Sequence, residues 1–425
     1  MSESSPDRSN YDVLVMGGGP AGSATAARLA GQGFKTLLIE KDRHPRFHIG
    51  ESLLPLSIPY LSELGVLDQV EAIGLRKYAA EFHSIYHDRV TRFEFGDAMD
   101  PRYPYAFEVR RADFDHLLWN NALAKGALGI EDCRIDQVSI DAQGIRFVSA
   151  VDGQGQRHQF KARFYVDATG RDTLLADHLG TKRRNPRHRS AAVYGHFKGA
   201  SRATGRDEGN ISIYWFDHGW FWMIPLKDGT MSVGAVCRPD YLKARTVPVN
   251  QFLQDTIRLS PGVSERLGSA ELIGDATATG NYSYQSTRMT GKNYLMVGDA
   301  YAFIDPVFSS GVHLALHGAF KASECVASIL KEPKTATARL KQYEAANRRG
   351  LSVFSWFIYR ITTPAIRHLF MYPQNFFDTP KAVTSVLAGD IFGETPIGLR
   401  LMVFRLIYHV HSLLMRLGLK PAVSR

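Results

Sequence analysis

Cysteine is scarce in this chain of 425 residues. Cys133, Cys237 and Cys325 stand far apart, so neither a disulfide framework nor a cysteine-type zinc site is expected. No run of about 18 uncharged apolar residues is present, so a membrane-spanning helix is not expected. No secretory hydrophobic region follows the polar start, residues 1–10, which we expect to be a disordered tail. These absences favour a cytoplasmic protein in a reducing compartment.

Acidic residues are in the minority. Lys and Arg number 51 against 42 Asp and Glu, which gives a net charge of +9. From Lys341 to Arg425 there are 11 basic and 4 acidic residues, so +7 of this charge lies in the last fifth of the chain. A solvated basic helical tail, an acidic partner surface and an anionic membrane are the open interpretations. Nucleic acid is not an expected partner, because no recognised binding motif accompanies the charge.

The first forty residues predict a dinucleotide-binding unit. Tyr11–Met16 is typical of a buried parallel strand, and Thr36–Ile39 of a second strand. Between them a GxGxxG motif opens an Ala-rich helix, and its residues are Gly17, Gly19, Pro20, Ala21 and Gly22. The glycines allow a tight turn, and the helix N-terminus offers free N–H groups to a pyrophosphate. Glu40 stands 23 residues after the first glycine, where a ribose hydroxyl would be bound.

Three further segments favour FAD over NAD as the dinucleotide. Val109–Asp115 (VRRADFD) opens a helical pattern, Phe164–Arg171 is a strand with a glycine turn, and Asn293–Ala300 is a strand closed by Gly-Asp-Ala. Together they resemble the FAD-binding aromatic hydroxylase superfamily. The resemblance implies that Asp299 binds the ribityl chain and that Arg111 lies near the cofactor. No second GxGxxG follows a strand, so we expect a separate flavin reductase to supply the reduced FAD.

An aromatic segment narrows the chemistry. Asn210–Cys237 predicts an antiparallel meander, in which the two-residue period places Trp220, Trp222 and Ile224 on one face. Packing in a sheet core would account for that face by itself. However, Trp-x-Trp-x-Ile-Pro, which ends at Pro225, resembles the hallmark of flavin-dependent halogenases. In that family the two indoles keep the substrate away from the flavin.

A second halogenase signature, F-x-x-P-x-x-S-x-G, spans Phe303–Gly311. A loop of small residues entering a helix presents unpaired N–H groups beside the positive end of the helix dipole. The resemblance implies that the backbone N–H groups of Ser310 and Gly311 hold chloride or bromide next to the flavin, with Pro306 in the flavin surroundings. A simple helix cap at Ser309 or Ser310 is compatible with this interpretation.

A lysine completes the resemblance. Arg76–Phe82 (RKYAAEF) is similar to the halogenase stretch K-x-G-A-x-F, with Ala79 in place of the usual glycine. A lone lysine is far more often solvent-exposed than catalytic. In this context Lys77 would take up hypohalous acid and present electrophilic halogen, with burial lowering its pKa. The stretch RFHIGES resembles the turn R-x-x-I-G-E-S, which implies that Arg46 and Ser52 contribute to the flavin surroundings.

The resemblance also implies a reaction and a branch. Reduced FAD and oxygen would oxidise halide to hypohalous acid, which would pass the two indoles to reach Lys77. The tryptophan-specific branch is longer and carries a glutamate where this chain has Phe308. Both differences favour a phenolic or pyrrolic substrate, either free or tethered to an acyl carrier protein. The alternatives are an FAD-dependent monooxygenase that hydroxylates an aromatic ring, and a non-catalytic, membrane-associated FAD-binding protein.

The expected fold is α/β, with a Rossmann-like three-layer FAD domain, an inserted antiparallel sheet and a C-terminal helical region. The FAD-binding core covers residues 11–335, with the sheet at about 190–285, and the helical region covers 336–425. One helix is expected over Pro396–Leu417, with a broad apolar face. Its narrow polar stripe consists of Arg400, Arg405, His409, Ser412 and Arg416. Such a helix docks on its own protein, forms a dimer interface, covers the substrate mouth or makes peripheral membrane contact.

Overall fold

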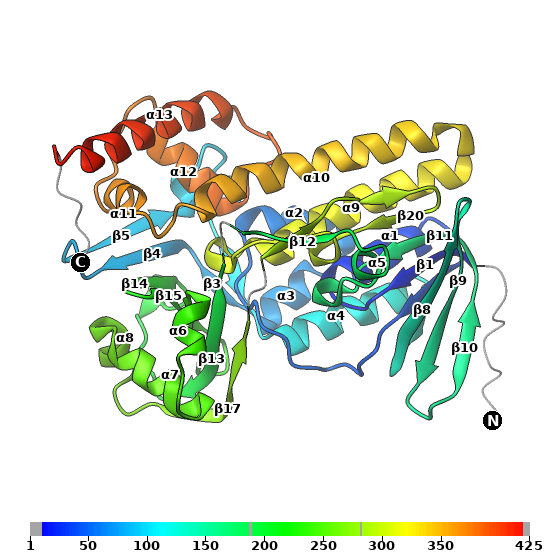
Figure 1. Cartoon of the computed structure of the whole chain (residues 1–425), viewed down its shortest axis with the longest axis horizontal. Helices are drawn as coiled ribbons and strands as arrows, with labels where there is room; N and C mark the ends of the chain where they lie inside the picture. The colour runs from blue at the N-terminus through cyan, green and yellow to red at the C-terminus, as the bar shows by residue number, and fades with distance from the viewer. Residues whose placement is uncertain (1–10, 187–188, 281–282, 420–425) are drawn as a thin grey trace.

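A six-stranded sheet carries the N-terminal motif in the computed structural model, which describes residues 11–186, 189–280 and 283–419 (Figure 1). The expected tail, residues 1–10, lies outside these ranges. In spatial order the strands are β19 (Thr290–Gly291), β20 (Tyr294–Met296), β11 (Ala162–Asp167), β1 (Tyr11–Met16), β2 (Thr36–Ile39) and β7 (Leu128–Ile130). Every neighbouring pair is parallel except β19 with β20. Long apolar runs form these strands because both faces of a parallel sheet are covered.

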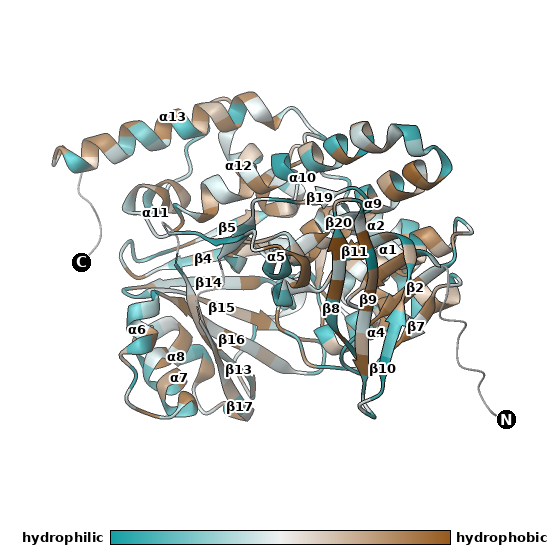
Figure 2. Ribbon diagram, turned by 45° about the vertical axis from the view of Figure 1, so that its right-hand side comes forward, coloured by the Kyte–Doolittle hydropathy of each residue, from teal (hydrophilic) through white to brown (hydrophobic). Residues whose placement is uncertain are grey.

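Helices cover one face of this sheet and a second sheet covers the other (Figures 1 and 2). The helices are α1 (Pro20–Ala30), α4 (Arg111–Ala124) and α9 (Ser310–Lys331). The covering sheet consists of β8 (Cys133–Asp141), β9 (Gly144–Asp152) and β10 (Arg157–Phe160). This arrangement has the expected three layers. All three cysteines are buried within the fold.

A seven-stranded mixed sheet is the other large sheet of the molecule. Its order is β17 (Glu271–Thr279), β13 (Ala191–Lys198), β16 (Thr230–Cys237), β15 (Gly219–Pro225), β14 (Ile211–Phe216), β4 (Ala79–Ser84) and β5 (Arg89–Glu94). The sheet is larger than the expected antiparallel insertion at 190–285, because β4 and β5 join it and β14 pairs with β4 in parallel. Sequence periodicity specifies which face of a strand is apolar but not which distant strand lies beside it.

Smaller elements connect the two sheets. The short strands are β3 (Leu75–Lys77), β6 (Ala106–Glu108), β12 (Lys182–Arg184), β18 (Tyr284–Ser286) and β21 (Ala302–Phe303). β3 pairs with β6, whereas β12, β18 and β21 form a separate sheet. The connecting helices include α2 (Ile58–Leu64), α3 (Leu67–Ile73), α5 (Leu174–His178), α6 (Pro239–Lys243), α7 (Val249–Arg258) and α8 (Pro261–Leu267).

The C-terminal region is helical, as expected from residue 336 onward. It consists of α10 (Ala336–Ile358), α11 (Pro364–Met371), α12 (Thr379–Ala388) and α13 (Ile397–Arg416). Proline stands in the first turn of α11 and α12, where its missing N–H costs no helical hydrogen bond. These helices and the indole-bearing face of the mixed sheet share one apolar core, while α7 and α8 cover the opposite face.

Helix α13 is long and apolar enough to cross a membrane by length and composition alone, although Arg400 and Arg405 interrupt its apolar sequence. The helix differs from the sequence expectation in its polar stripe. At about 100° per residue, Arg405, His409, Ser412 and Arg416 share one flank of the helix, whereas Arg400 lies on the other.

Candidate active site

A cavity of about 690 Å³ collects segments that are far apart in the sequence. The sequence-predicted residues that line it are Gly17, Gly19, Pro20, Ala21, Glu40, Arg46, Ser52, Arg111, Trp220, Trp222, Ile224, Asp299, Pro306, Ser310 and Gly311. Gly22, Pro225 and Lys77 are not among the described residues at its surface. The structure therefore places the expected FAD, halide and indole residues around one space, with the lysine behind its wall.

The GxGxxG loop shapes one end of the cavity. Gly17 has a φ of +102°, and a Cβ there would lie 2.4 Å from the carbonyl oxygen of Ala168. A Cβ at Gly22 would lie 1.8 Å from the carbonyl oxygen of Gly17, so this glycine serves helix packing and does not face the cavity. The Oε2 atom of Glu40 accepts the Gly18 N–H at 2.6 Å. The N-terminus of α1 is thus open to an anion, with the acidic side chain fixed beside it.

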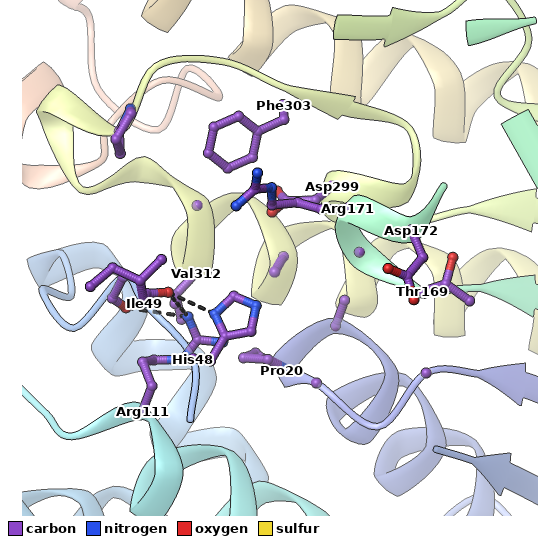
Figure 3. A pocket seen from close by; sticks show the side chains of 18 of the residues that line it. Pro20, His48, Ile49, Arg111, Thr169, Arg171, Asp172, Asp299, Phe303 and Val312 are labelled. Carbon is purple, nitrogen blue, oxygen red and sulfur yellow. Dashed lines mark hydrogen bonds between the residues drawn. The ribbon is translucent and has the colours of Figure 1, made fainter. Parts of the chain in front are cut away.

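Asp299 lies at the turn after β20, and both Asp299 and Arg171 line the cavity (Figure 3). Burial raises the pKa of this carboxyl to about 6, although Arg171 and Arg111 act in the opposite direction. The guanidinium of Arg171 is held in turn by Thr279, whose Oγ1 accepts from Nη2 at 2.8 Å. A half-buried carboxylate that lines a cavity can accept a hydrogen bond from a ligand hydroxyl, which fits the ribityl role expected for Asp299.

Asp115 fixes two arginines at the cavity wall. Its carboxylate accepts from Nε and Nη2 of Arg111 at 2.8 and 3.0 Å, and from Nη1 of Arg46 at 3.1 Å. Arg111 also donates to the carbonyl of Ile49 (Figure 3). The charge of Arg111, burial and the charge of Arg46 lower the pKa of the neighbouring His48 to about 4, although Asp115 acts in the opposite direction. The neutral imidazole of His48 and the guanidinium groups of Arg46 and Arg111, which Asp115 holds in place, therefore line this wall of the cavity.

The loop before α9 carries the residues that are expected to bind the halide. Ser309 precedes the helix with a φ of +54°, and its side chain makes no capping hydrogen bond. The expected serine cap is thus absent at this position among the described contacts. Ser310 and Gly311 are the first two residues of α9, whose N–H groups have no carbonyl partner within a helix. A Cβ at Gly311 would meet nothing within 4 Å, so the backbone there is open to the cavity.

The indoles occupy the expected face of strand β15. Trp220, Trp222 and Ile224 belong to one apolar core, whereas Phe221 and Met223 belong to the core on the other face. The two indole rings lie 6.1 Å apart and are both buried. The Nε1 atom of Trp222 donates to Ser232 at 3.1 Å, so its orientation is fixed. The rings thus form a rigid wall of the cavity.

Lys77 lies behind Ser52. Its side chain is 1% exposed, and Nζ donates to the Ser52 Oγ at 2.5 Å. The same ammonium is 3.6 Å from Oε1 of Glu108, which also accepts from Ser52 at 3.1 Å. Burial lowers the pKa of Lys77 and raises that of Glu108 to about 7, while their mutual attraction opposes both shifts. Ser52 lines the cavity and therefore connects this buried pair to it.

Sequence reasoning missed three acidic residues of the site. Asp115 and Glu108 lie within and just before the VRRADFD stretch, and Glu51 lies inside the RFHIGES turn. Glu51 is buried, and its Oε1 is 2.7 Å from Nε2 of His196 on β13. These three residues lie in or next to the signature stretches, and that position could have identified them as candidates. Their hydrogen-bond and ion-pair partners could not be predicted in this way, because most of the partners lie on distant segments of the chain.

Comparisons with known proteins agree on the family. The family model described as tryptophan halogenase matches residues 12–102 and 75–363. A tryptophan 2-halogenase from Chondromyces crocatus is 36% identical over 329 residues, which cover 76% of this chain and 62% of that protein. A 1H-pyrrole-2-carbonyl-[peptidyl-carrier protein] chlorinase from Pseudomonas fluorescens is 28% identical over 409 residues, or 90% of each chain.

Solved structures agree on the fold. The myxobacterial chondrochloren halogenase CndH, described as an FAD-dependent halogenase, superposes with a TM-score of 0.80 at 29% identity. The match covers 96% of this chain and 97% of that one. By contrast, the chain spans less than two thirds of the length of the first curated relatives, at 62% and 64%.

Proposed function

Because the chain belongs to the tryptophan halogenase family, we propose that it is a flavin-dependent halogenase that installs chlorine or bromine on an electron-rich aromatic ring. The observation that carries this proposal is the single cavity that joins the N-terminus of α1, the first turn of α9 and the two indoles. The residues that line the cavity offer the hydrogen-bonding groups that FAD requires. When bound, reduced FAD would activate oxygen for the oxidation of the halide. A separate flavin reductase would deliver its electrons.

The chain's own residues would hold the cofactor at both ends. The first-turn N–H groups of α1 bind the pyrophosphate, while Glu40 faces the ribose. Asp299 accepts from the ribityl hydroxyls. Arg111 and Arg46 are held in place by Asp115, so they keep a fixed positive potential along the cavity wall.

The halide is a substrate held by backbone groups. The N–H groups of Ser310 and Gly311 point away from the helix that they begin, and the positive end of the α9 dipole favours an anion there. The open backbone at Gly311 leaves room for chloride or bromide. Because the proposed ligands are backbone N–H groups, either halide would satisfy this site.

Lys77 would then polarise hypohalous acid that reaches its side of Ser52, the residue that connects the lysine to the cavity. An ammonium that donates to the oxygen of that acid draws electron density from the halogen, which the arene attacks. The bond between oxygen and halogen breaks, the oxygen leaves as water with the ammonium proton, and a base takes the displaced ring proton. Burial lowers the pKa of the Lys77 amine, and the Glu108 carboxylate opposes this shift by favouring the ammonium. The two buried indoles would keep the substrate away from the flavin, so that direct hydroxylation cannot compete.

We infer the substrate class from Phe308, although this side chain is not among the described residues that line the cavity. This buried residue lies among Phe354, Phe357 and Phe370, with ring centroids 6.1 to 6.5 Å away. An apolar surrounding offers no partner to a charged amino-acid group, whereas a phenol or pyrrole brings only one polar hydrogen. We therefore propose a phenolic or pyrrolic ring. The relative named as a chlorinase of a carrier-bound pyrrole supports tethering to an acyl carrier protein as one form of this substrate.

The test supplies reduced FAD from a flavin reductase, with oxygen, bromide and a panel of phenols and carrier-bound pyrroles. Mass spectrometry should show the bromine isotope pair in one product. An added oxygen atom without bromine would instead indicate a hydroxylase. Absence of any product across the panel, with FAD bound, would contradict both.

A further inference from the structure

Helix α13 presents an apolar stripe that the described part of the chain leaves uncovered. The stripe consists of Leu399, Met402, Leu406, Val410, Leu413 and Leu417, which are between 47% and 66% exposed. At 3.6 residues per turn the six side chains fall within about 80° of the helix circumference. The opposite side, with Leu401, Phe404 and Tyr408, is buried. Figure 2 shows α13 as the outermost helix, packed through that side on α11 and α12.

The charge on α13 itself has one sign. From Thr395 to Arg425 the sequence contains five Lys or Arg residues and no Asp or Glu. His409 and Arg416 are exposed on the flank of α13 next to the stripe. This combination of an aliphatic face with basic residues at its edge is typical of helices that lie in the interface of an anionic bilayer.

A neighbouring loop adds aromatic side chains. Phe376 and Phe377, between α11 and α12, are 51% and 79% exposed. The loop lies beside α13, since Asp378 is paired with Arg400 at 3.8 Å. Exposed rings next to an apolar stripe extend the surface that can enter the boundary between headgroups and acyl chains.

We propose that α13 docks the protein on an anionic lipid surface, with the helix lying in the plane of that surface. The buried side packs on α11 and α12, so the helix cannot span the bilayer while the fold is intact. A second copy of this chain is a poorer occupant, because paired α13 helices would bring their basic flanks together without a carboxylate. A lipid surface also accepts an aliphatic strip about 27 Å long without requiring a matching shape.

Sedimentation of the full-length chain with vesicles tests the proposal. Binding should be strong with phosphatidylcholine mixed with phosphatidylglycerol, and weak with phosphatidylcholine alone. The double substitution Leu406→Glu and Leu413→Glu should abolish binding, because both side chains are exposed on the stripe. Arg416→Gln should weaken binding to the anionic vesicles about fivefold, the effect of one basic residue near the surface.

The matched control is Leu259→Glu, which changes another exposed leucine, at the end of α7. This variant should bind the vesicles as the unaltered chain does.

The proposal would be overturned if the double variant bound the vesicles as well as the unaltered chain does. It would also be overturned if the unaltered chain bound neither kind of vesicle. A stable dimer in size-exclusion chromatography that the double substitution dissociates would assign the stripe to a second copy. Capture of an acidic carrier protein without vesicle binding would assign it to that partner. None of these measurements depends on halogenation, so they stand apart from the proposed reaction.

Discussion

The Nζ atom of Lys77 lies 3.6 Å from Oε1 of Glu108, and both side chains are buried. The pair arises where β3 meets β6, two three-residue strands that connect the larger sheets. Ser52 contacts both groups and reaches the cavity. Burial lowers the pKa of this amine and the Glu108 carboxylate opposes the shift, so the charge state of the lysine depends on both.

Lys77→Ala should keep flavin binding and the release of hydrogen peroxide but lower halogenation about 100-fold or more. The remaining Glu108 can protonate, because burial already raises its pKa to about 7. The fold should therefore tolerate the change. Product yield is measured by mass spectrometry, with Lys334→Ala on the surface as the matched control. Full yield from the Lys77 variant would refute the assigned role.

Glu108→Gln should shift the alkaline limb of the pH–rate profile to lower pH. The Glu108 carboxylate raises the pKa of Lys77 against the effect of burial. Without that charge, the lysine loses its proton at a lower pH, and the ammonium form disappears sooner. The measurement is kcat against pH for the two proteins under saturating halide. An unchanged alkaline limb would show that Glu108 does not set the charge of the lysine.

Asp299→Asn should stabilise the protein without FAD while weakening FAD binding. Burial raises the pKa of this aspartate from 3.8 to about 6, so the folded state binds the proton more tightly than the unfolded chain. The free energy of unfolding then falls as pH rises from about 4 to about 6. At neutral pH the substitution should recover about 2–3 kcal/mol. It should cost roughly tenfold in FAD affinity through one lost charged hydrogen bond.

Denaturant unfolding at pH 4 and pH 7 checks the first effect, and fluorescence titration with FAD checks the second. The variant should lose the pH dependence of stability that this carboxyl contributes. If both proteins show the same fall in stability across this range, the carboxyl does not hold its proton as the structure indicates.

Local features of the site could be predicted from the sequence because backbone geometry depends on neighbouring residues. The turn at Gly17 requires a positive φ, and the alternation around Trp220 assigns its face without any distant contact. The position of Lys77 behind Ser52 could not be predicted, since it depends on the pairing of two short strands. The parallel pairing of β14 with β4 was missed for the same reason.

NADH or NADPH alone should not reduce FAD bound to this chain at a useful rate. The described cavity contains one glycine-rich turn at a helix N-terminus, which the FAD pyrophosphate would occupy. Addition of a separate flavin reductase should restore turnover. Anaerobic bleaching of the flavin absorbance provides the measurement. Rapid bleaching by NADPH without a reductase would favour the hydroxylase alternative.

Phenolic or carrier-bound aryl substrates should be halogenated far better than free tryptophan. Phe308 is buried in an aromatic cluster, so it can neither accept a proton nor pair with an ammonium group. Free tryptophan brings an ammonium and a carboxylate. Burial of an uncharged polar group without a hydrogen-bond partner already costs about 2–7 kcal/mol, and burial of an unpaired charged group costs more. A phenol needs only one hydrogen bond for its hydroxyl.

The measurement is a competition in one reaction, in which equimolar tryptophan and a simple phenol compete for limiting reduced FAD. Mass spectrometry compares the amounts of the two halogenated products. Chlorotryptophan as the main product would overturn the substrate class and leave the halogenase assignment in place.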